Sequence, residues 1–396
     1  MHMQRSYQKT IYACYIGYIT QGVVNCYAPL LFLTFISYGW ASLRTVTLIT
    51  TINFAFQLLV DLLSAHFVDK IGYRICIVSA HIFSAAGLIG LAVLPRILPI
   101  PFLGLIISVI LYAIGGGLLE VLVSPIVEAC PSENKVAAMS ILHSFYCWGV
   151  VAVIALSTLY MWLFGRDSWQ SLCFIWALLP LGNAVLFSRV PINSLTEKGE
   201  GMKLRELFKT KVFWVFMLLM LAAGASEMGM SQWASAFAES GLNVSKTVGD
   251  LAGPCMFAIL MGLARSLYGK FGAKINLRAF ITLSGVLCLL SYVLAAASPS
   301  PVLSLVGCGI CGFSVGIMWP GVFSLAAEGL PRGGTALFAM LALAGDLGCT
   351  GAPTLIGFVS SAAGDDLRIG LALAVIFPIV LILGILLQRK TAKKTD

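Results

Sequence analysis

The chain has 396 residues, of which 59% are hydrophobic and only 11% are charged, with a formal net charge of +8. A soluble domain has roughly 25% charged residues, so this chain has too few charged side chains to cover a surface that faces water. Its mean hydropathy of +0.95 therefore excludes an ordinary soluble enzyme and indicates a protein that lies largely in lipid.

Apolar segments recur along the whole chain, each long enough for a transmembrane helix of about 20 residues. In chain order they lie near residues 11–37, 45–68, 75–95, 101–124, 138–160, 169–189, 211–237, 247–268, 275–297, 301–325, 336–360 and 367–388. The longest polar stretch, 191–209, separates six spans from six, and Leu204, Leu207 and Phe208 within it predict a short amphipathic helix at the membrane surface. We therefore expect an all-α membrane protein of 12 transmembrane helices in two six-helix bundles, 1–190 and 210–396, joined by a linker over 191–209.

The basic residues are unevenly divided between the two ends of these spans. If both termini are cytoplasmic, the cytoplasmic segments hold 20 of the 25 lysines and arginines. The positive-inside rule then predicts cytoplasmic N- and C-termini, a cytoplasmic linker and a plasma-membrane protein. It also accounts for the net charge, so no nucleic-acid partner is expected.

The cysteines give no sign of a metal site or a cofactor. Most of the 11 lie within apolar runs, where a free thiol behaves as a small hydrophobe. Cys308 and Cys311 form a CxxC pair without further ligands nearby. We expect no metal, no cofactor and a monomer in the bilayer.

The two halves match each other at an offset of 200 residues. Gly72 and Arg74 correspond to Gly272 and Lys274, and the segment around span 4 corresponds to the one around span 10 through Gly116/Gly316, Ser124/Ser324, Glu128/Glu328 and Pro131/Pro331. Together with the six-plus-six pattern of spans, these matches predict a duplicated, pseudo-symmetric pair of bundles.

Polar side chains inside the first two spans recur every four residues. Gln21 and Asn25 share one face of span 1, and Asn53, Gln57 and Asp61 share one face of span 2. Because lipid cannot face such stripes, the stripe on span 2 lines either a cavity or a helix–helix contact, and the sequence leaves both open.

Glu120 in span 4 is the candidate proton-coupling residue. It follows Gly115–Gly117 and precedes Glu128 by two turns, which places it near mid-membrane. A buried carboxyl group favours its neutral form and can load and release a proton as a cavity opens to each side. The alternative is a protonated carboxyl group that is simply hydrogen-bonded within the bundle.

Further candidates lie in spans 5, 7, 8 and 11. Glu227, Gln232 and Trp233 in span 7 suit a hydroxylated ligand, although Trp233 fits an interfacial aromatic belt equally well. Asp346 in span 11 either binds substrate or pairs with Arg265 or His143. His143 in span 5 is a substrate-binding candidate, and a hydrogen-bonded structural imidazole is its alternative. Arg265 is interpreted as structural, one turn from Lys270 and able to snorkel to the cytoplasm.

The loop between spans 2 and 3 carries a family resemblance. The sequence Ala65-His-Phe-Val-Asp69-Lys70-Ile-Gly72-Tyr-Arg74 resembles the signature of the major facilitator superfamily. The resemblance implies a cytoplasmic gating latch in which Asp69 and Arg74 pair with neighbouring helix ends, with Glu128 as a partner. Spans 4–5, with Glu120, Ser124, Glu128 and His143, resemble those of the fucose–galactose–glucose:proton symporters, in which a carboxylate at the Glu120 position is implicated in coupling. The acid that this family carries in span 1 is missing here.

These features predict a secondary transporter and no enzyme. The leading hypothesis is proton-coupled uptake of a small hydrophilic solute, a sugar or polyol, with Gln21, Asn25, Asn53, Gln57, His143, Glu227, Gln232, Trp233 and Asp346 as the substrate site. Export of drugs or amphipathic metabolites by proton antiport is the alternative. It is disfavoured because drug:proton antiporters of this superfamily usually carry a glycine-rich signature in span 5, where this chain has only Gly149. A non-transporting membrane sensor is the third, and the short linker and tail provide no signalling domain for it.

Overall fold

The computed structural model describes residues 2–131, 135–192, 202, 204–271, 276–330 and 332–392, and every regular element in these ranges is helical. The chain divides into two compact units, an N-terminal unit of residues Met1–Glu197 and a C-terminal unit of residues Lys198–Asp396. The division falls within the linker expected from the sequence. Within the described residues, 12 helical segments are long and apolar enough to cross a membrane.

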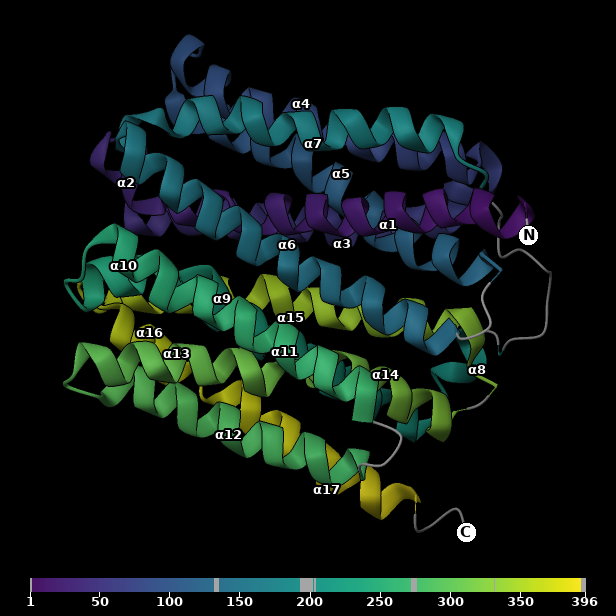
Figure 1. The fold of residues 1–396 in the computed structure, drawn as a ribbon. Helices are drawn as coiled ribbons and strands as arrows, with labels where there is room; N and C mark the ends of the chain where they lie inside the picture. Colours follow the sequence, from purple (N-terminus) through teal and green to yellow (C-terminus); the bar gives the residue numbers. More distant parts are fainter. Residues whose placement is uncertain are drawn as a thin grey trace. The chain divides into compact units, whose positions relative to one another are not determined.

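The N-terminal unit contains the first six spans (Figure 1). In order they are formed by α1 (His2–Cys26) with η1 (Ala28–Leu31) and α2 (Phe32–Ser37), α3 (Leu43–Ile71), α4 (Tyr73–Ile97), α5 (Pro101–Ala129), α6 (Lys135–Phe164), and η2 (Arg166–Ser168) with α7 (Trp169–Arg189). Helix α1 packs against α5, α6 and α7, while α4 packs against α5 and α7.

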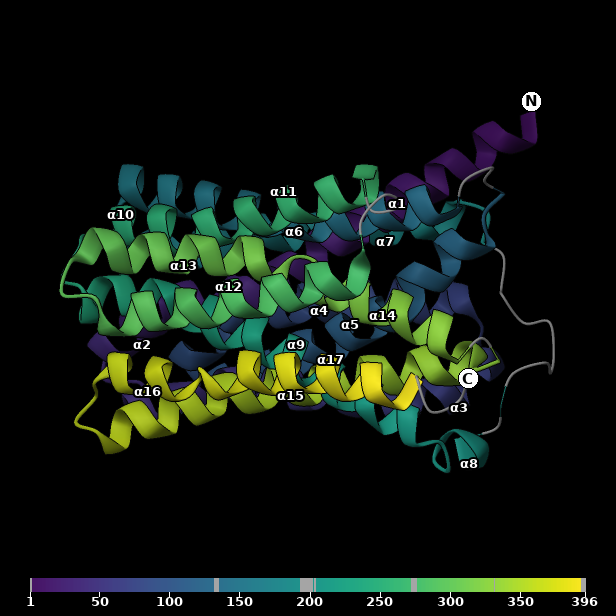
Figure 2. The ribbon, with the colours of Figure 1, turned by 90° about the horizontal axis from the view of Figure 1, so that it is seen from below.

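The C-terminal unit contains the other six spans, and Figure 2 shows α12 and α13 of this unit side by side. Its elements are α8 (Leu204–Leu207), α9 (Lys211–Ala236) with η3 (Phe237–Gly241), α10 (Lys246–Asp250) with η4 (Leu251–Cys255) and α11 (Met256–Phe271), α12 (Leu277–Ala297), α13 (Pro301–Val315) with α14 (Met318–Gly329), α15 (Gly334–Ala362), and α16 (Leu367–Leu373) with α17 (Ile376–Ala392). The expected amphipathic helix of the linker is the single turn α8, in which Leu207 is buried.

The same helix neighbours recur in the two units. The pairs α1·α6, α3·α5, α4·α5 and α4·α7 of the N-terminal unit correspond to α9·α15, α11·α13, α12·α13 and α12·α17 of the C-terminal unit. The duplication expected from matches at an offset of 200 residues is therefore present in the packing of each bundle.

A single glycine makes the turn between α3 and α4. Helix α3 ends at Ile71 and α4 begins at Tyr73, and Gly72 between them has φ 98°. A residue with a side chain rarely adopts this backbone conformation. The glycine of the loop signature is thus required by the sharp turn itself.

Four spans of the C-terminal unit are not regular α-helices. The seventh span ends in the π-helical segment η3, and the eighth contains the π-helical segment η4. The tenth is interrupted between Val315 and Met318, and the twelfth between Leu373 and Ile376. Such departures from regular hydrogen bonding are tolerated in a membrane only where neighbouring groups satisfy the freed backbone. They are frequent at functional sites.

Candidate functional site

Four amide side chains of α1 and α3 form one hydrogen-bonded group in the N-terminal unit, which we call the amide cluster: Gln21, Asn25, Asn53 and Gln57. Gln57 Nε2 donates to Asn25 Oδ1 and to Asn53 Oδ1, each at 2.9 Å, and Gln21 Nε2 donates to Gln57 Oε1 at 2.8 Å. Asn53 Nδ2 also donates to Asn25 Oδ1 at 3.2 Å. The two polar stripes seen in the sequence therefore meet each other.

Glu120 on α5 joins this cluster, because its Oε2 accepts a hydrogen bond of 3.3 Å from Gln21 Nε2. The glycines before it make this approach possible. A Cβ atom added at Gly116 would lie 3.1 Å from Gln21 Oε1 and 3.2 Å from Gln57 Cδ. At Gly117, a Cβ atom would lie 2.9 Å from the Gln57 carbonyl oxygen. The glycines allow α5 to approach α3 closely and leave room for the amide cluster.

The amide cluster includes Asn53 and Gln57, two of the three residues of the polar stripe on span 2. All four side chains are buried, with Gln57 only 1% exposed, and they bond to one another at a contact of α1, α3 and α5. The buried Gln21 Oε1 has no hydrogen-bond partner. This oxygen could accept a hydrogen bond from a ligand. The role of the amide cluster in substrate binding remains a prediction.

His143 on α6 lies against the N-terminal helix. Its ring centroid is 5.2 Å from that of Tyr18, whose hydroxyl group forms a hydrogen bond of 2.8 Å with Ser124 Oγ on α5. His143 is half-buried. Its described contacts therefore link α6 to α1, and its role in substrate binding stays a prediction.

His81 on α4 is held as a neutral imidazole by its surroundings. Its Nδ1 lies 2.7 Å from the Ile77 carbonyl oxygen, an acceptor, so Nδ1 carries the proton. Asn183 Nδ2, fixed by its hydrogen bond of 2.9 Å to the Ala13 carbonyl oxygen, donates to His81 Nε2 at 2.7 Å. Both ring nitrogens are therefore engaged, with α4 and α7, and Asn183 in turn ties α7 to α1.

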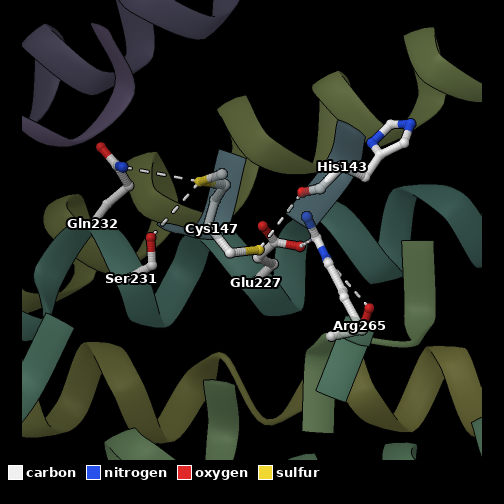
Figure 3. A network of polar contacts seen from close by, with 8 residues as sticks. His143, Cys147, Glu227, Ser231, Gln232 and Arg265 are labelled. Atoms are coloured by element: carbon white, nitrogen blue, oxygen red, sulfur yellow. Dashed lines mark hydrogen bonds and ion pairs between the residues drawn. The ribbon is translucent and has the colours of Figure 1, made fainter. Parts of the chain in front are cut away.

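In the C-terminal unit, Glu227 on α9 forms an ion pair with Arg265 on α11. Arg265 Nη2 and Glu227 Oε2 are 3.1 Å apart, and the two side chains are 9% and 7% exposed. Figure 3 shows the two groups pointing toward each other. The expectation that Arg265 snorkels to the cytoplasm is wrong, because a buried carboxylate within reach compensates its charge better than a distant water surface.

Gln232 and Trp233 follow Glu227 on α9, and both are buried. The side chains of Ser231 and Gln232 lie 3.8 Å from the Met228 sulfur (Figure 3). Trp233 Nε1 donates to the Pro353 carbonyl oxygen on α15 at 2.9 Å. Trp233 therefore joins α9 to α15 and is not part of an interfacial aromatic belt.

Asp346 is buried in the middle of α15, with 3% of its surface exposed. The glycines beside it pack closely on other helices. A Cβ atom at Gly345 would lie 2.1 Å from the Trp319 ring, and one at Gly348 would lie 2.0 Å from the Leu221 carbonyl oxygen on α9. The glycines of span 11 thus serve helix packing around Asp346.

Arg74, one of the expected latch residues, binds the end of α7. Its guanidinium donates hydrogen bonds of 2.9 Å to the carbonyl oxygens of Phe187, Ser188 and Val190. The side chains of Asp69 and Glu128 lie outside the described part of the chain. Arg74 thus holds the C-terminal end of α7 against the start of α4, and a gating role remains a prediction.

One buried acid escaped the sequence analysis. Asp250, at the end of α10, is fully buried, accepts a hydrogen bond from Ser235 Oγ on α9 and pairs with Lys246 Nζ at 3.0 Å. The signal was present in the sequence as an acid four residues after a lysine at the start of a span. This group lies between the two π-helical segments η3 and η4.

Each unit is a bundle of six spans with the same helix neighbours, and each contains buried polar side chains. A comparison with known protein families identifies the family that has this arrangement. The family model described as Major Facilitator Superfamily matches residues 14–353. The chain belongs to the Major Facilitator Superfamily. The resemblance found in the loop between spans 2 and 3 is confirmed, and this superfamily member is an integral membrane protein of a transporter family.

Solved structures place this superfamily member beside sugar symporters in fold. It is similar to the D-xylose-proton symporter with a TM-score of 0.79 and 14% identity over 97% of each chain. It is also similar to the E. coli fucose:proton symporter, with a TM-score of 0.67 and 13% identity over 97% of this chain and 99% of that one. A search of curated protein sequences finds no match. At this low identity the structural similarity establishes the shared fold and does not identify a substrate.

Proposed function

We propose that the chain is a secondary transporter that takes up a small hydrophilic solute, a sugar or polyol, together with protons. The observation that carries the proposal is the hydrogen bond between Glu120 and Gln21, which connects a carboxyl group to the amide cluster inside a bundle. The similarity in fold to the D-xylose-proton and fucose:proton symporters supports the same solute class.

The amide cluster suits a hydroxylated ligand for a simple chemical reason. An amide side chain both donates and accepts hydrogen bonds, as a sugar hydroxyl group does. The hydroxyl groups of a solute can therefore replace the bonds that Gln21, Asn25, Asn53 and Gln57 form with one another, without leaving a polar group unpaired. An apolar drug would bury the same groups without partners, which disfavours the exporter alternative.

Glu120 provides a route for coupling the proton to the solute. The ionised carboxylate can only accept hydrogen bonds, as it does from Gln21 Nε2. The protonated group gains a donor, which changes the bonds that Gln21 can offer to a ligand. Loading the proton therefore alters the same amide cluster that is proposed to hold the solute.

The remaining parts of the proposal follow the superfamily. Transport would proceed by alternating access, with Arg74, Asp69 and Glu128 as a cytoplasmic latch and both termini on the cytoplasmic side of the plasma membrane. The substrate-binding roles predicted for His143, Glu227, Gln232, Trp233 and Asp346 remain part of the proposal. Glu227 is paired with Arg265, and the Trp233 indole donates to the Pro353 carbonyl oxygen.

Transport by the purified protein in liposomes tests the proposal. A panel of pentoses, hexoses and polyols is offered with and without an inward proton gradient, and we expect gradient-driven accumulation of at least one of them. Glu120→Gln mimics the loaded form, so exchange of solute at equal concentrations should persist while accumulation disappears. Asp61→Asn is the control, because it removes another acid of the same bundle and should leave the residual transport gradient-driven. Accumulation by the Glu120→Gln variant would refute the role of Glu120, and efflux of amphipathic compounds alone would favour the exporter.

A further inference from the structure

The tenth span is interrupted at a point that its sequence explains. Helix α13 ends at Val315 and α14 begins at Met318, with Gly316 and Ile317 between them. In a continuous helix the Gly316 carbonyl oxygen would accept from the amide of residue 320, which is Pro320 and has no N–H group. The proline ring also crowds that carbonyl group, so the helix departs from its regular path here.

Arg265 supplies a donor to this carbonyl group. Its Nε donates to the Gly316 oxygen at 3.3 Å. The close approach of α11 requires a glycine, because a Cβ atom at residue 316 would lie 2.7 Å from Ala264 Cβ and 2.9 Å from the Met261 carbonyl oxygen. The side chain of Arg265 therefore replaces, from a neighbouring helix, the backbone donor that Pro320 lacks.

Glu227 compensates the charge of the buried Arg265 guanidinium group. A buried charge without a partner is strongly unfavourable, and Glu227 Oε2 lies 3.1 Å from Arg265 Nη2. The pair is neutral overall, and the hydrogen bond to Gly316 uses a different nitrogen from the one that faces Glu227. Three segments, α9, α11 and the junction of α13 with α14, are thus joined through one side chain.

The junction of α13 with α14 also determines how the side chain of Trp319 packs on α15. Trp319, in the first turn of α14, packs so closely on Gly345 that a Cβ atom there would lie 2.1 Å from the ring. Gly345 precedes the buried Asp346. The direction in which α14 leaves the junction therefore decides how the indole ring meets the segment that carries Asp346.

We propose that Arg265 is a positioning residue: by donating to the Gly316 carbonyl group in place of Pro320, it holds the interruption of span 10 and seats Trp319 on the Gly345–Asp346 segment. This rests on the proposed function only in the role given to Asp346.

The first half of the chain supports a specific role for this arrangement. At an offset of 200 residues, Gly116 corresponds to Gly316, but Ala65 stands in place of Arg265 and Glu120 in place of Pro320. There α5 runs without interruption from Pro101 to Ala129. An arginine at position 265 and a proline at position 320 therefore occur together in the half whose helix is interrupted, and neither residue type stands at the corresponding position, 65 or 120, in the half whose helix is continuous.

The test compares the full-length protein with a charge-free variant, Glu227→Gln/Arg265→Met, by hydrogen exchange measured with mass spectrometry. We expect amide exchange at residues 316–321 and at 343–348 to rise roughly 10- to 100-fold, the loss expected for a buried hydrogen bond to a charged group. Arg368→Met is the matched control, since Arg368 also donates to helix-end carbonyl groups of this unit, those of Ala296 and Ser298. It should leave both segments unchanged.

Adding Pro320→Ala separates positioning from simple filling of a hydrogen bond. The alanine restores an N–H group to the Gly316 carbonyl, so exchange at 316–321 should return to within about twofold of the original value. Exchange at 343–348 should stay high, because the straightened helix no longer seats Trp319. If both segments recover, Arg265 only fills a vacant acceptor and the proposal is overturned. Unchanged exchange in the charge-free variant would overturn it as well.

Pro320→Ala alone keeps the test decisive if the charge-free variant does not fold. It should protect residues 316–321 and raise exchange at 343–348, and no change in either segment would contradict the proposal. These measurements need no substrate. A failure to accumulate any sugar or polyol would therefore refute the proposed function and leave this inference intact.

Discussion

Gln57 takes part in three of the hydrogen bonds that hold the amide cluster together. Gln57→Leu preserves the size of the side chain but removes all three, leaving Gln21, Asn25 and Asn53 short of partners in a buried site. An unsatisfied buried polar group costs about 1–3 kcal/mol. We expect the variant to unfold at a clearly lower temperature in detergent and to lose solute binding.

Thr47→Val is the matched control for this prediction. Thr47 is buried on the same helix, and its hydroxyl group donates to the Leu43 carbonyl oxygen four residues earlier, a bond of 2.8 Å. Its loss removes a donor and leaves that carbonyl group in the helical ladder, so the expected cost is below about 1 kcal/mol. Equal stability losses in the two variants would show that the amide cluster is not cooperative.

Cys130, just beyond the end of α5, gives a prediction about pH. Burial raises the pKa of its thiol to about 11, above the ordinary value of about 8.5. The thiolate is the reactive form, so at pH 8 only about 0.1% of Cys130 is reactive, against about a quarter of an ordinary cysteine. Labelling of Cys130 by a maleimide should therefore be several hundred times slower than that of Ser188→Cys, at an exposed position, and should accelerate about tenfold per pH unit up to about pH 11. Equal rates at pH 8 would contradict the burial of this thiol.

Single residues show where sequence reasoning succeeds and where it stops. The four-residue spacing of Gln21 with Asn25 and of Asn53 with Gln57 was sufficient to predict that these side chains are buried against other polar groups, because a polar stripe on a helix in lipid must have a polar partner. The partner of Arg265 was not predictable in this way. Glu227 lies 38 residues away on another helix, and only the packing of α9 on α11 brings the two charges together.

Helix α15 packs on α9 through residues without side chains, and this gives a prediction at the scale of elements. A Cβ atom at Gly348 would lie 2.0 Å from the Leu221 carbonyl oxygen, whereas nothing lies within 4 Å of one at Gly351. Gly348→Ala must therefore push the two helices apart, at a cost of about 1–3 kcal/mol or more. Gly351→Ala adds helix propensity in open space and should be neutral or stabilising by roughly 0.5–1 kcal/mol.

Thermal unfolding of the two variants checks this prediction on neighbouring turns of one helix. Both changes add the same methyl group to the same helix, so they differ only in what that group meets. A drop in midpoint for Gly348→Ala with an unchanged or higher midpoint for Gly351→Ala supports the close crossing. The opposite order would show that α9 and α15 are not in such close contact.

Hydropathy predicted the existence of the spans better than their internal structure. The spans near 247–268 and 301–325 are predominantly apolar, yet the first contains the π-helical segment η4 and the second is interrupted at Gly316 and Ile317. Hydropathy reports which residues tolerate lipid, and it carries no information about which carbonyl group meets which donor. Pro254 and Pro320 were the visible signals, since each removes one donor from its helix.

At the scale of the whole molecule, duplication was predictable while the division of labour between the halves was not. The repeated neighbours, such as α1·α6 and α9·α15, follow from matches that the sequence shows. The buried chemistry differs, however: hydrogen-bonded amides and Glu120 in one half, and the ion pair of Glu227 with Arg265 in the other. Equivalent positions have exchanged polar for apolar residues, so one half cannot be inferred from the other.

The distribution of basic residues makes a final prediction, about the side of the membrane on which each loop lies. With Arg265 moved from the cytoplasmic count into the buried ion pair, the side that carries both termini still holds 19 lysines and arginines, and the other side holds five. Such a bias fixes orientation because basic loops are retained in the cytoplasm during insertion.

Cysteines introduced at the exposed positions Ser37→Cys and Ala362→Cys should react with an impermeant maleimide on intact cells. The exposed positions Ser188→Cys and Arg332→Cys should react only after the cells are permeabilised. The 11 native cysteines are buried, so the unmodified chain provides the background. Labelling of Ser188→Cys and Ala362→Cys from the same side would contradict the odd number of spans, five, between them, and full reversal of the pattern would contradict the cytoplasmic termini alone.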